Sequence, residues 1–354
     1  MEESLARHGN EDTNTPFPML VRRLDVRMRD NLAEMDQDPI VDLIAIVQLV
    51  THLHNLERIV IAPSIDIFRD SLQIGVSQIL LSCPVSLKSF HVLDTDFQHS
   101  QTGRPGIQWR DFFRDFYLSH PRIDAISNRM EFATSGVHLP HVRTIYYWNQ
   151  AGRWFQDFLR LDFPVLRNAI YDTNTMVCLR GPPAIHEDVQ FFLKYGPQLR
   201  FLQLHISKKV DTEVLYNMFK AIKESCLNLR ILELVTSGDR IWDTTPGGPS
   251  PELPPRVASV RFRFGTMPDT TTAMSMLEAL PQFLSSSPAM KSFQFTKESD
   301  ITRLACLKRP SLFADTLPGL MDRGIAVLNH KGDVLTNLEI NRLRGMSVLA
   351  QIGL

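Results

Sequence analysis

The chain has 354 residues, of which 44% are hydrophobic and 22% charged, and its formal net charge is −1. This composition is that of an ordinary globular protein, and the length allows about two domains or one elongated array of repeats. The near-neutral balance argues against a nucleic-acid partner or a membrane surface, both of which usually need a clear basic excess.

The first residues are polar and acidic, so we expect a disordered tail over residues 1–18 and not a signal peptide. No uninterrupted apolar run reaches about 18 residues, so we expect no transmembrane helix. The spacing of the four cysteines matches neither a disulfide framework nor a zinc site. Reduced thiols are typical of a cytoplasmic or nuclear protein. The cysteines are Cys83, Cys178, Cys226 and Cys306.

A seven-residue pattern recurs along the chain. Residues 198–204 read QLRFLQL, and residues 228–234 read NLRILEL. The apolar letters follow L-x-x-L-x-L, whose last part alternates as a strand with one buried face does. Looser versions are VRRLDV (21–26), NLERIVI (55–61), SLKSFHV (86–92), HVRTIYY (141–147), RVASVRF (256–262) and AMKSFQF (289–295), with weak candidates in RIDAISN (122–128) and VLRNAIY (165–171). The pattern thus predicts a series of short strands.

Helical spacing of apolar residues fills several of the gaps between these segments. It predicts helices over residues 39–54, 186–195, 211–226 and 269–287. Pro281 should kink the last of these or split it in two. Each unit therefore reads strand, turn, helix, turn, with a period of about thirty residues, and stacked units bury the stripe that a single unit leaves open.

The sequence predicts an α/β solenoid over residues 19–333, with a curved parallel sheet on its concave side and helices on its convex side. A proline- and glycine-rich loop insertion covers residues 238–256, and residues 334–354 form a C-terminal capping segment. A doubly wound α/β domain is the alternative, because it also alternates strands and helices. The recurring L-R-x-L-x-L wording and the lack of a glycine-rich first turn favour the solenoid.

Phosphate-binding loops, nucleophile elbows, kinase signatures and H-E-x-x-H zinc motifs are absent from the sequence. We therefore expect no catalytic residues, no metal site and no cofactor. The histidine pairs His52/His54 and His138/His141 fit a helix end and a turn. Cys83 and Cys226 each close a predicted helix, where a small inert thiol packs well. Asp94 and Asp96, or the loop insertion, leave open the alternative of an enzyme with a non-standard site.

In L-x-x-L-x-L the intervening letters point out of the sheet, and stacked strands align them on one concave surface. Aromatic and arginine side chains are enriched at interface hot spots, which predicts a protein-binding face there. Coverage by loops of the same chain, or a register shifted by one residue, is the competing explanation. The predicted partner-binding residues are Arg23, Arg27, Arg58, Tyr146, Trp148, Phe201, His205, Glu233, Arg261 and Arg263.

Four segments carry a resemblance to a known family: VRRLDV (21–26), HLHNLERIVI (52–61), YGPQLRFLQLHIS (195–207) and SCLNLRILELVTS (225–237). They resemble the degenerate leucine-rich repeats of F-box-type proteins, especially fungal ones, over about residues 20–300. In that family an F-box docks on a Skp1-type adaptor of a cullin ubiquitin ligase, and the repeats select the substrate. The resemblance implies a non-catalytic substrate-recognition module. No L-P-x-E-like start precedes Val21, so a scaffold unrelated to ubiquitin is the alternative to a ligase receptor.

Overall fold

The protein is a mixed α/β chain in which parallel strands form sheets and helices pack beside them. A computed structural model describes residues 17–27, 39–62, 77–92, 115–127, 138–148, 159–173, 183–206, 210, 212–236, 251–265, 270–305, 310–342 and 345. At the ends of some elements it describes the backbone alone. No helix in these ranges is long and apolar enough to cross a membrane.

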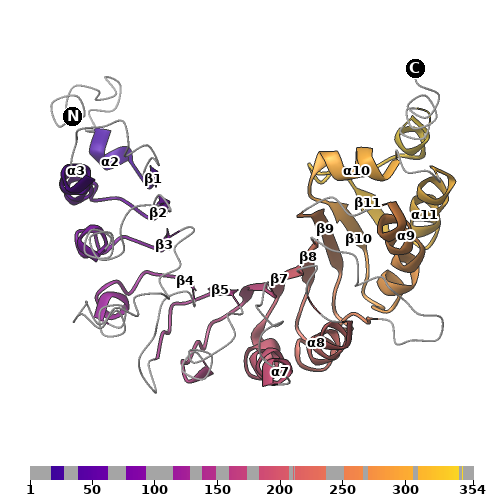
Figure 1. The fold of residues 1–354 in the computed structure, drawn as a ribbon, viewed down its shortest axis with the longest axis horizontal. Coiled ribbons are helices and arrows are strands. Elements are labelled where there is room, and N and C mark those ends of the chain that lie inside the picture. The colour runs from indigo at the N-terminus through magenta and orange to yellow at the C-terminus, as the bar shows by residue number, and fades with distance from the viewer. Residues whose placement is uncertain are drawn as a thin grey trace. The chain divides into compact units, whose positions relative to one another are not determined.

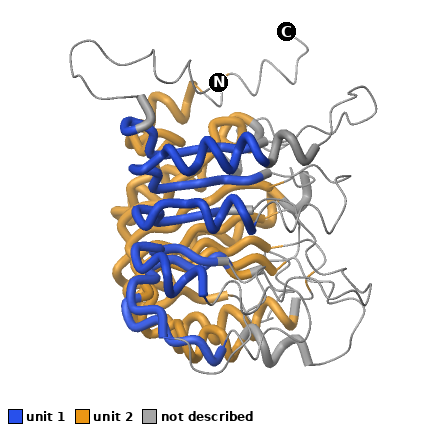
Figure 2. The backbone as a smooth tube through the Cα atoms, turned by 90° about the vertical axis from the view of Figure 1, so that its left-hand side faces the viewer, with its two compact units in different colours: residues 1–146, 156–165 blue, residues 147–155, 166–354 orange. Residues whose placement is uncertain are grey.

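The chain divides into two compact units, coloured separately in Figure 2. Unit 1 comprises residues 1–146 and 156–165, and unit 2 comprises residues 147–155 and 166–354. Unit 1 holds the short helix α2 (Phe17–Leu20) and helix α3 (Pro39–His52). Its strands are β1 (Arg23–Arg27), β2 (Arg58–Ala62), β3 (Ser89–Val92), β4 (Ala125–Ser127) and the first three residues of β5 (Thr144–Trp148), whose last two residues are assigned to unit 2.

The strands of unit 1 run parallel. β1, β2 and β3 form one ladder, and β4 pairs with β5. Between the two groups, the backbone N–H of Asp124 donates to the carbonyl of Lys88 at 2.8 Å. The weak candidate segment RIDAISN contains strand β4. Each of the stronger candidate segments in this half of the sequence also contains a strand.

Unit 2 holds a parallel ladder in which each strand pairs with the next one along the chain (Figure 1). The strands are β6 (Asn168–Asp172), β7 (Phe201–Ile206), β8 (Ile231–Thr236), β9 (Ser259–Phe264), β10 (Ser292–Phe295) and β11 (Ala326–Leu328). The two echoing segments QLRFLQL and NLRILEL lie side by side, with Leu202 opposite Leu232 and Leu204 opposite Leu234. The repeat in the sequence is thus a repeat of neighbouring strands, as predicted.

Helices lie in the connections from β6 to β7, β7 to β8, β9 to β10 and β10 to β11, because parallel strands need a crossover before they can pair. They are α7 (Pro183–Tyr195), the 3₁₀ turn η3 (Gly196–Gln198), α8 (Thr212–Ser225), α9 (Thr270–Ser285), α10 (Glu298–Ala305) and α11 (Pro310–Asp322). α7 packs against α8, and α9 against α11 (Figure 1). α8 shows why: Leu215, Met218 and Ile222 are buried along one stripe, while Glu213 and Lys220 are exposed. α8 thus hides one apolar face from solvent.

Helix α9 decides one of the two outcomes predicted at Pro281, the split of the helix. The helix continues unbroken from Thr270 to Ser285 with Pro281 inside it, so it is not split into two helices. The exit of α11 follows a Schellman pattern, in which Gly324 N–H donates to Met321 O at 2.8 Å and Ile325 N–H to Leu320 O at 3.0 Å. Gly324 has φ +79°, a left-handed conformation that glycine adopts without steric cost. This turn ends the helix and starts β11.

One tight turn precedes most strands, and it is predicted from the sequence only at residues 138–141. Its fourth residue, the first leucine of L-x-x-L-x-L, donates a backbone hydrogen bond to the first residue. Examples are Leu199 to Gly196 at 3.1 Å and Leu229 to Cys226 at 3.0 Å. Proline occupies the second position of many of these turns, where its fixed φ suits a β-turn. These prolines are Pro121, Pro140, Pro164, Pro197, Pro255 and Pro288.

The residue after each turn links consecutive repeats. The carbonyl of Arg200 accepts two hydrogen bonds from the next repeat, from Arg230 N at 2.8 Å and Ile231 N at 3.1 Å. The carbonyls of Glu57, Arg167, Arg230 and Ala258 each accept a similar pair. This shared pattern sets the register of the strands before the strands themselves begin.

An aromatic core closes the first part of unit 2. Tyr147 stacks on Tyr171 with ring centroids 4.9 Å apart, and Phe191 of α7 lies 4.8 Å from Tyr147. Phe192 and Tyr195 complete the group, and all five rings are almost fully buried. Large aromatic side chains bury much apolar area, so this cluster fixes α7 against the strands.

Candidate functional site

One face of the unit 2 ladder carries polar and charged side chains in register. We call this the open face: the residues of β6–β10 that alternate with the buried apolar rows. In β7 and β9 the predicted alternation is confirmed, since every second side chain is buried and the others are partly exposed. The open face comprises Asn168, Ile170, Asp172, Phe201, Gln203, His205, Ile231, Glu233, Val235, Ser259, Arg261, Arg263, Ser292 and Gln294.

A carboxylate and an imidazole lie close together where Asp172, the last residue of β6, pairs with β7. Asp172 lies opposite His205 in the register, and its Oδ2 is 3.8 Å from Nδ1 of that ring. The other ring nitrogen, Nε2, lies 2.9 Å from Nε2 of Gln203. Burial lowers the pKa of His205, Arg263 lowers it further, and Asp172 opposes both without overcoming them. The ring is therefore held toward its neutral form beside a buried acid.

The next two strands place one acid beside two arginines. Glu233 lies opposite Arg261, and Val235 opposite Arg263. Burial raises the pKa of Glu233 although Arg263 and Arg261 both act to lower it. The Nε atom of Arg261 is shielded from solvent and has no hydrogen-bond partner among the described residues. The open face therefore holds charged groups that are partly desolvated and incompletely paired.

Five of the ten predicted binding residues come together on this face: Phe201, His205, Glu233, Arg261 and Arg263. The prediction missed Asp172 and Gln294. The segment of β6 matches the repeat pattern poorly, so the sequence alone does not give the register of β6 that places Asp172 on this face. Gln294 faces Arg261 across the ladder and donates from Nε2 to the carbonyl of Asn329 at 3.1 Å. The F-Q-F alternation at 293–295 is the sequence signal from which Gln294 could have been predicted to face outward.

The remaining predicted residues belong to strands β1, β2 and β5. Arg23 is exposed and pairs with Asp25, its Nε lying 2.9 Å from Oδ1. Arg58 is exposed and donates from Nε to Oγ of Ser89 at 3.2 Å. Burial raises the pKa of Tyr146, which also feels the charges of Arg58 and Asp124. Arg27 and Trp148 lie in β1 and β5 by backbone, but their side chains fall outside the described part.

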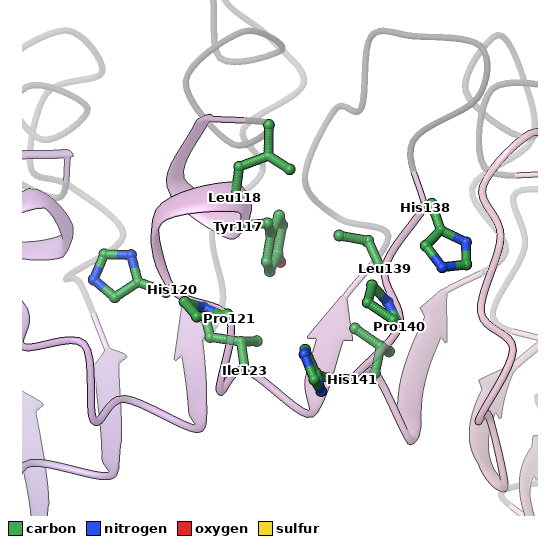
Figure 3. Close-up of a pocket in the computed structure, with 10 residues that line it drawn as sticks. Tyr117, Leu118, His120, Pro121, Ile123, His138, Leu139, Pro140 and His141 are labelled. Carbon is green, nitrogen blue, oxygen red and sulfur yellow. The ribbon is translucent and has the colours of Figure 1, made fainter.

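A separate pocket of about 270 Å³ lies in unit 1, between the turns that precede β4 and β5 (Figure 3). Its middle is apolar, formed by side chains such as Tyr117, Ile123 and Leu139. Figure 3 shows the rings of His120 and His138 on opposite sides of this apolar group. His138 Nδ1 lies 2.7 Å from Oδ2 of Asp162, and both ring nitrogens of His120 lie within 3.1 Å of backbone carbonyls. The imidazoles are thus engaged separately and do not converge.

Two of the cysteines match the prediction of inert thiols. Cys83 and Cys226 are buried and free, and burial raises the pKa of each thiol to about 12. Cys178 and Cys306 lie outside the described residues. Across the described ranges, no group of three or more histidines, cysteines or acids is placed to hold a metal ion.

Chemically, the open face offers hydrogen-bond donors and acceptors, with charges of both signs, next to three partly exposed apolar side chains, Ile170, Phe201 and Ile231. Asp94, Asp96 and residues 238–250 of the loop insertion, where the enzyme alternative was placed, lie outside the described residues. No family model matches the sequence, and the search of curated proteins found no match.

Proposed function

We propose that the chain is a non-catalytic recognition module that binds a protein partner through the open face of unit 2. In this proposal the repeats form a leucine-rich-repeat-like solenoid with the sheet on the concave side and the helices outside. Support comes from the hydrogen-bond pattern that repeats before successive strands and from the parallel order of β6–β11.

The state of Arg261 carries the proposal. Its Nε–H is removed from solvent without a partner among the described residues, and it flanks a carboxyl group whose pKa burial raises. Burying a polar donor without a hydrogen bond costs about 1–3 kcal/mol. A purely structural face would be more stable with apolar or neutral residues there. A partner that brings carboxylates to the partly exposed Arg261 and Arg263 pairs charges that the face itself leaves incompletely paired, and such residues are frequent hot spots.

Affinity purification with mass spectrometry tests the proposal. Wild-type protein is compared with Arg261→Ala/Arg263→Ala and with the matched control Lys220→Ala/Lys297→Ala, which removes two exposed lysines that lie outside the strands of the open face. The specific partner should be absent from the first variant and present with the control, while circular dichroism shows all three folded. Equal recovery by both variants would exclude the open face as the binding surface.

The ubiquitin link implied by the family resemblance needs its own measurement. Co-purification with a Skp1-type adaptor, scored on the same wild-type sample, supports a substrate receptor. Recovery of a specific partner without adaptor or cullin supports a scaffold unrelated to ubiquitin.

A further inference from the structure

A row of basic side chains lies at the start of the unit 2 strands, beside the open face. Arg167, Arg200, Arg230 and Lys291 each occupy the same position, immediately after the turn that precedes β6, β7, β8 and β10. Arg256 lies in the turn before β9, where the equivalent position is Ala258. All five are exposed, and we call them the basic rim.

The backbone fixes the positions from which these side chains start. Arg167 O accepts from Arg200 N at 2.7 Å, and Arg200 O accepts from Arg230 N at 2.8 Å. Arg230 O in turn accepts from Ala258 N at 2.9 Å, and Ala258 O from Lys291 N at 2.9 Å. The rim is therefore an ordered line with one strand spacing, about 4.8 Å, between neighbours.

The rim lacks acids of its own. The turn and pre-strand residues of this region, 164–167, 197–200, 227–230, 255–258 and 288–291, contain no aspartate or glutamate. Within the described ranges, no carboxylate pairs with Arg167, Arg200, Arg230 or Lys291. Arg256 donates to the neutral Asn228 Oδ1 at 2.9 Å.

The equivalent positions of unit 1 behave differently. There Arg22, Glu57, Lys88, Asp124 and Arg143 alternate in sign. Glu57 lies 3.0 Å from Lys88 and 3.9 Å from Arg22, so charge is neutralised along that row. A row of like charges carries a repulsive cost that this alternation avoids, so the basic rim calls for an anionic partner.

We propose that the basic rim binds an extended, Asp/Glu-rich peptide segment of the protein partner, running across the strands. This inference rests on the proposed function and adds the chemistry of the partner. Four strand spacings span about 19 Å, which an extended peptide covers with about six residues at about 3.3 Å each. The open face favours a peptide over a nucleic acid. Asp172 and Glu233 stand among its charges and would repel phosphates. Phe201 is the one aromatic ring of the open face, whereas single strands need a stacking platform.

Fluorescence anisotropy of a fluorescein-labelled hexaglutamate peptide, titrated with the full chain, tests the rim. We expect the affinity for the peptide to fall as the salt concentration rises. We also expect it to fall by about tenfold or more in Arg200→Glu/Arg230→Glu. The matched control Lys220→Glu/Lys297→Glu makes the same change of net charge elsewhere and should change affinity by less than about threefold. Hexalysine should not bind. If the glutamate variant fails to fold by circular dichroism, Arg200→Gln/Arg230→Gln replaces it.

Three results would overturn the proposal. Two are equal affinity of rim and control variants for hexaglutamate, and no binding of hexaglutamate by the wild type. A third is oligo-dT of equal charge binding through the same arginines more tightly than the peptide, which would assign the rim to nucleic acid. None of these touches the open-face proposal, whose readout is partner recovery and its loss in the Arg261/Arg263 variant.

Discussion

A β-carbon placed on Gly196 would lie 2.9 Å from Sγ of Cys226 and 3.0 Å from Cβ of Ser225. Gly196 and Cys226 are the first residues of the turns before β7 and β8, so they are the same position in consecutive repeats. The stacking of these repeats leaves no room for a side chain at the earlier position.

Gly196→Ala should therefore destabilise the protein by about 1–3 kcal/mol, because overpacking forces the neighbouring backbone to shift. Urea unfolding followed by circular dichroism measures the change. Gly319→Ala is the matched control, because Gly319 sits inside α11 and a β-carbon placed on it would meet nothing within 4 Å. Alanine is the better helix former there, so a gain of up to about 1 kcal/mol is expected. Equal stability of both variants would mean that the turns of consecutive repeats do not press together.

Leu232 and Glu233 are neighbours on opposite faces of β8, and their substitutions should differ sharply. Leu232 has no exposed surface, so Leu232→Ala should cost about 2–5 kcal/mol through lost burial and the cavity left behind. Glu233→Gln removes a charge that burial already disfavours, so stability near neutral pH should stay level or rise. Denaturant unfolding of both variants compares them. A large loss for Glu233→Gln would show that its pairing with the arginines outweighs desolvation.

The imidazole of His205 should make stability depend on pH. Its folded pKa lies below the unfolded value of about 6.5, so the unfolded chain binds more protons in the interval between them. Stability then rises with pH through that interval and is lost as the pH falls below about 6.5. His205→Gln should flatten the slope of unfolding free energy between about pH 5 and 7. Arg263 and Glu233 also face this site. An unchanged slope would show that Asp172 compensates for the burial of the ring.

The thiols of Cys83 and Cys226 should resist alkylation in the folded protein. A thiol with a pKa of about 12 is almost entirely protonated at about pH 8, and the thiolate is the nucleophile. In a Cys178→Ser/Cys306→Ser background, iodoacetamide should modify neither residue in native buffer and both in urea, as followed by mass spectrometry. Rapid native labelling would contradict their burial.

Strand positions and the parallel order of the repeats were predictable because the apolar positions of L-x-x-L-x-L are the residues that the strands bury. QLRFLQL and NLRILEL even give the offset at which Leu202 and Leu232 pair. The sequence pattern of β4 and β6 is weak, because strands of three to five residues show little alternation of apolar and polar residues. Pro281 does not split α9, because packing of that helix against α11 outweighs one missing backbone hydrogen bond.

The charged residues of the candidate site were predictable as outward-facing, but their interactions were not. Which acid meets His205 depends on the register of β6, and only pairing through space supplies Asp172. The basic rim was visible as L-R before several strands, yet its meaning depends on the absence of acids in five separate turns. Such an absence becomes informative once the turns are known to be neighbours.

The paired hydrogen bonds at successive pre-strand carbonyls, such as those of Arg167, Arg200 and Arg230, make these repeats interchangeable at their joints. Arg167 presents to Arg200 the same acceptor that Arg200 presents to Arg230. A duplicated copy of residues 197–226 would find a matching joint on either side, so the array can lengthen by whole units without redesign of its neighbours. Each added copy would also carry one more arginine, and the length of the anionic segment accommodated would grow with copy number.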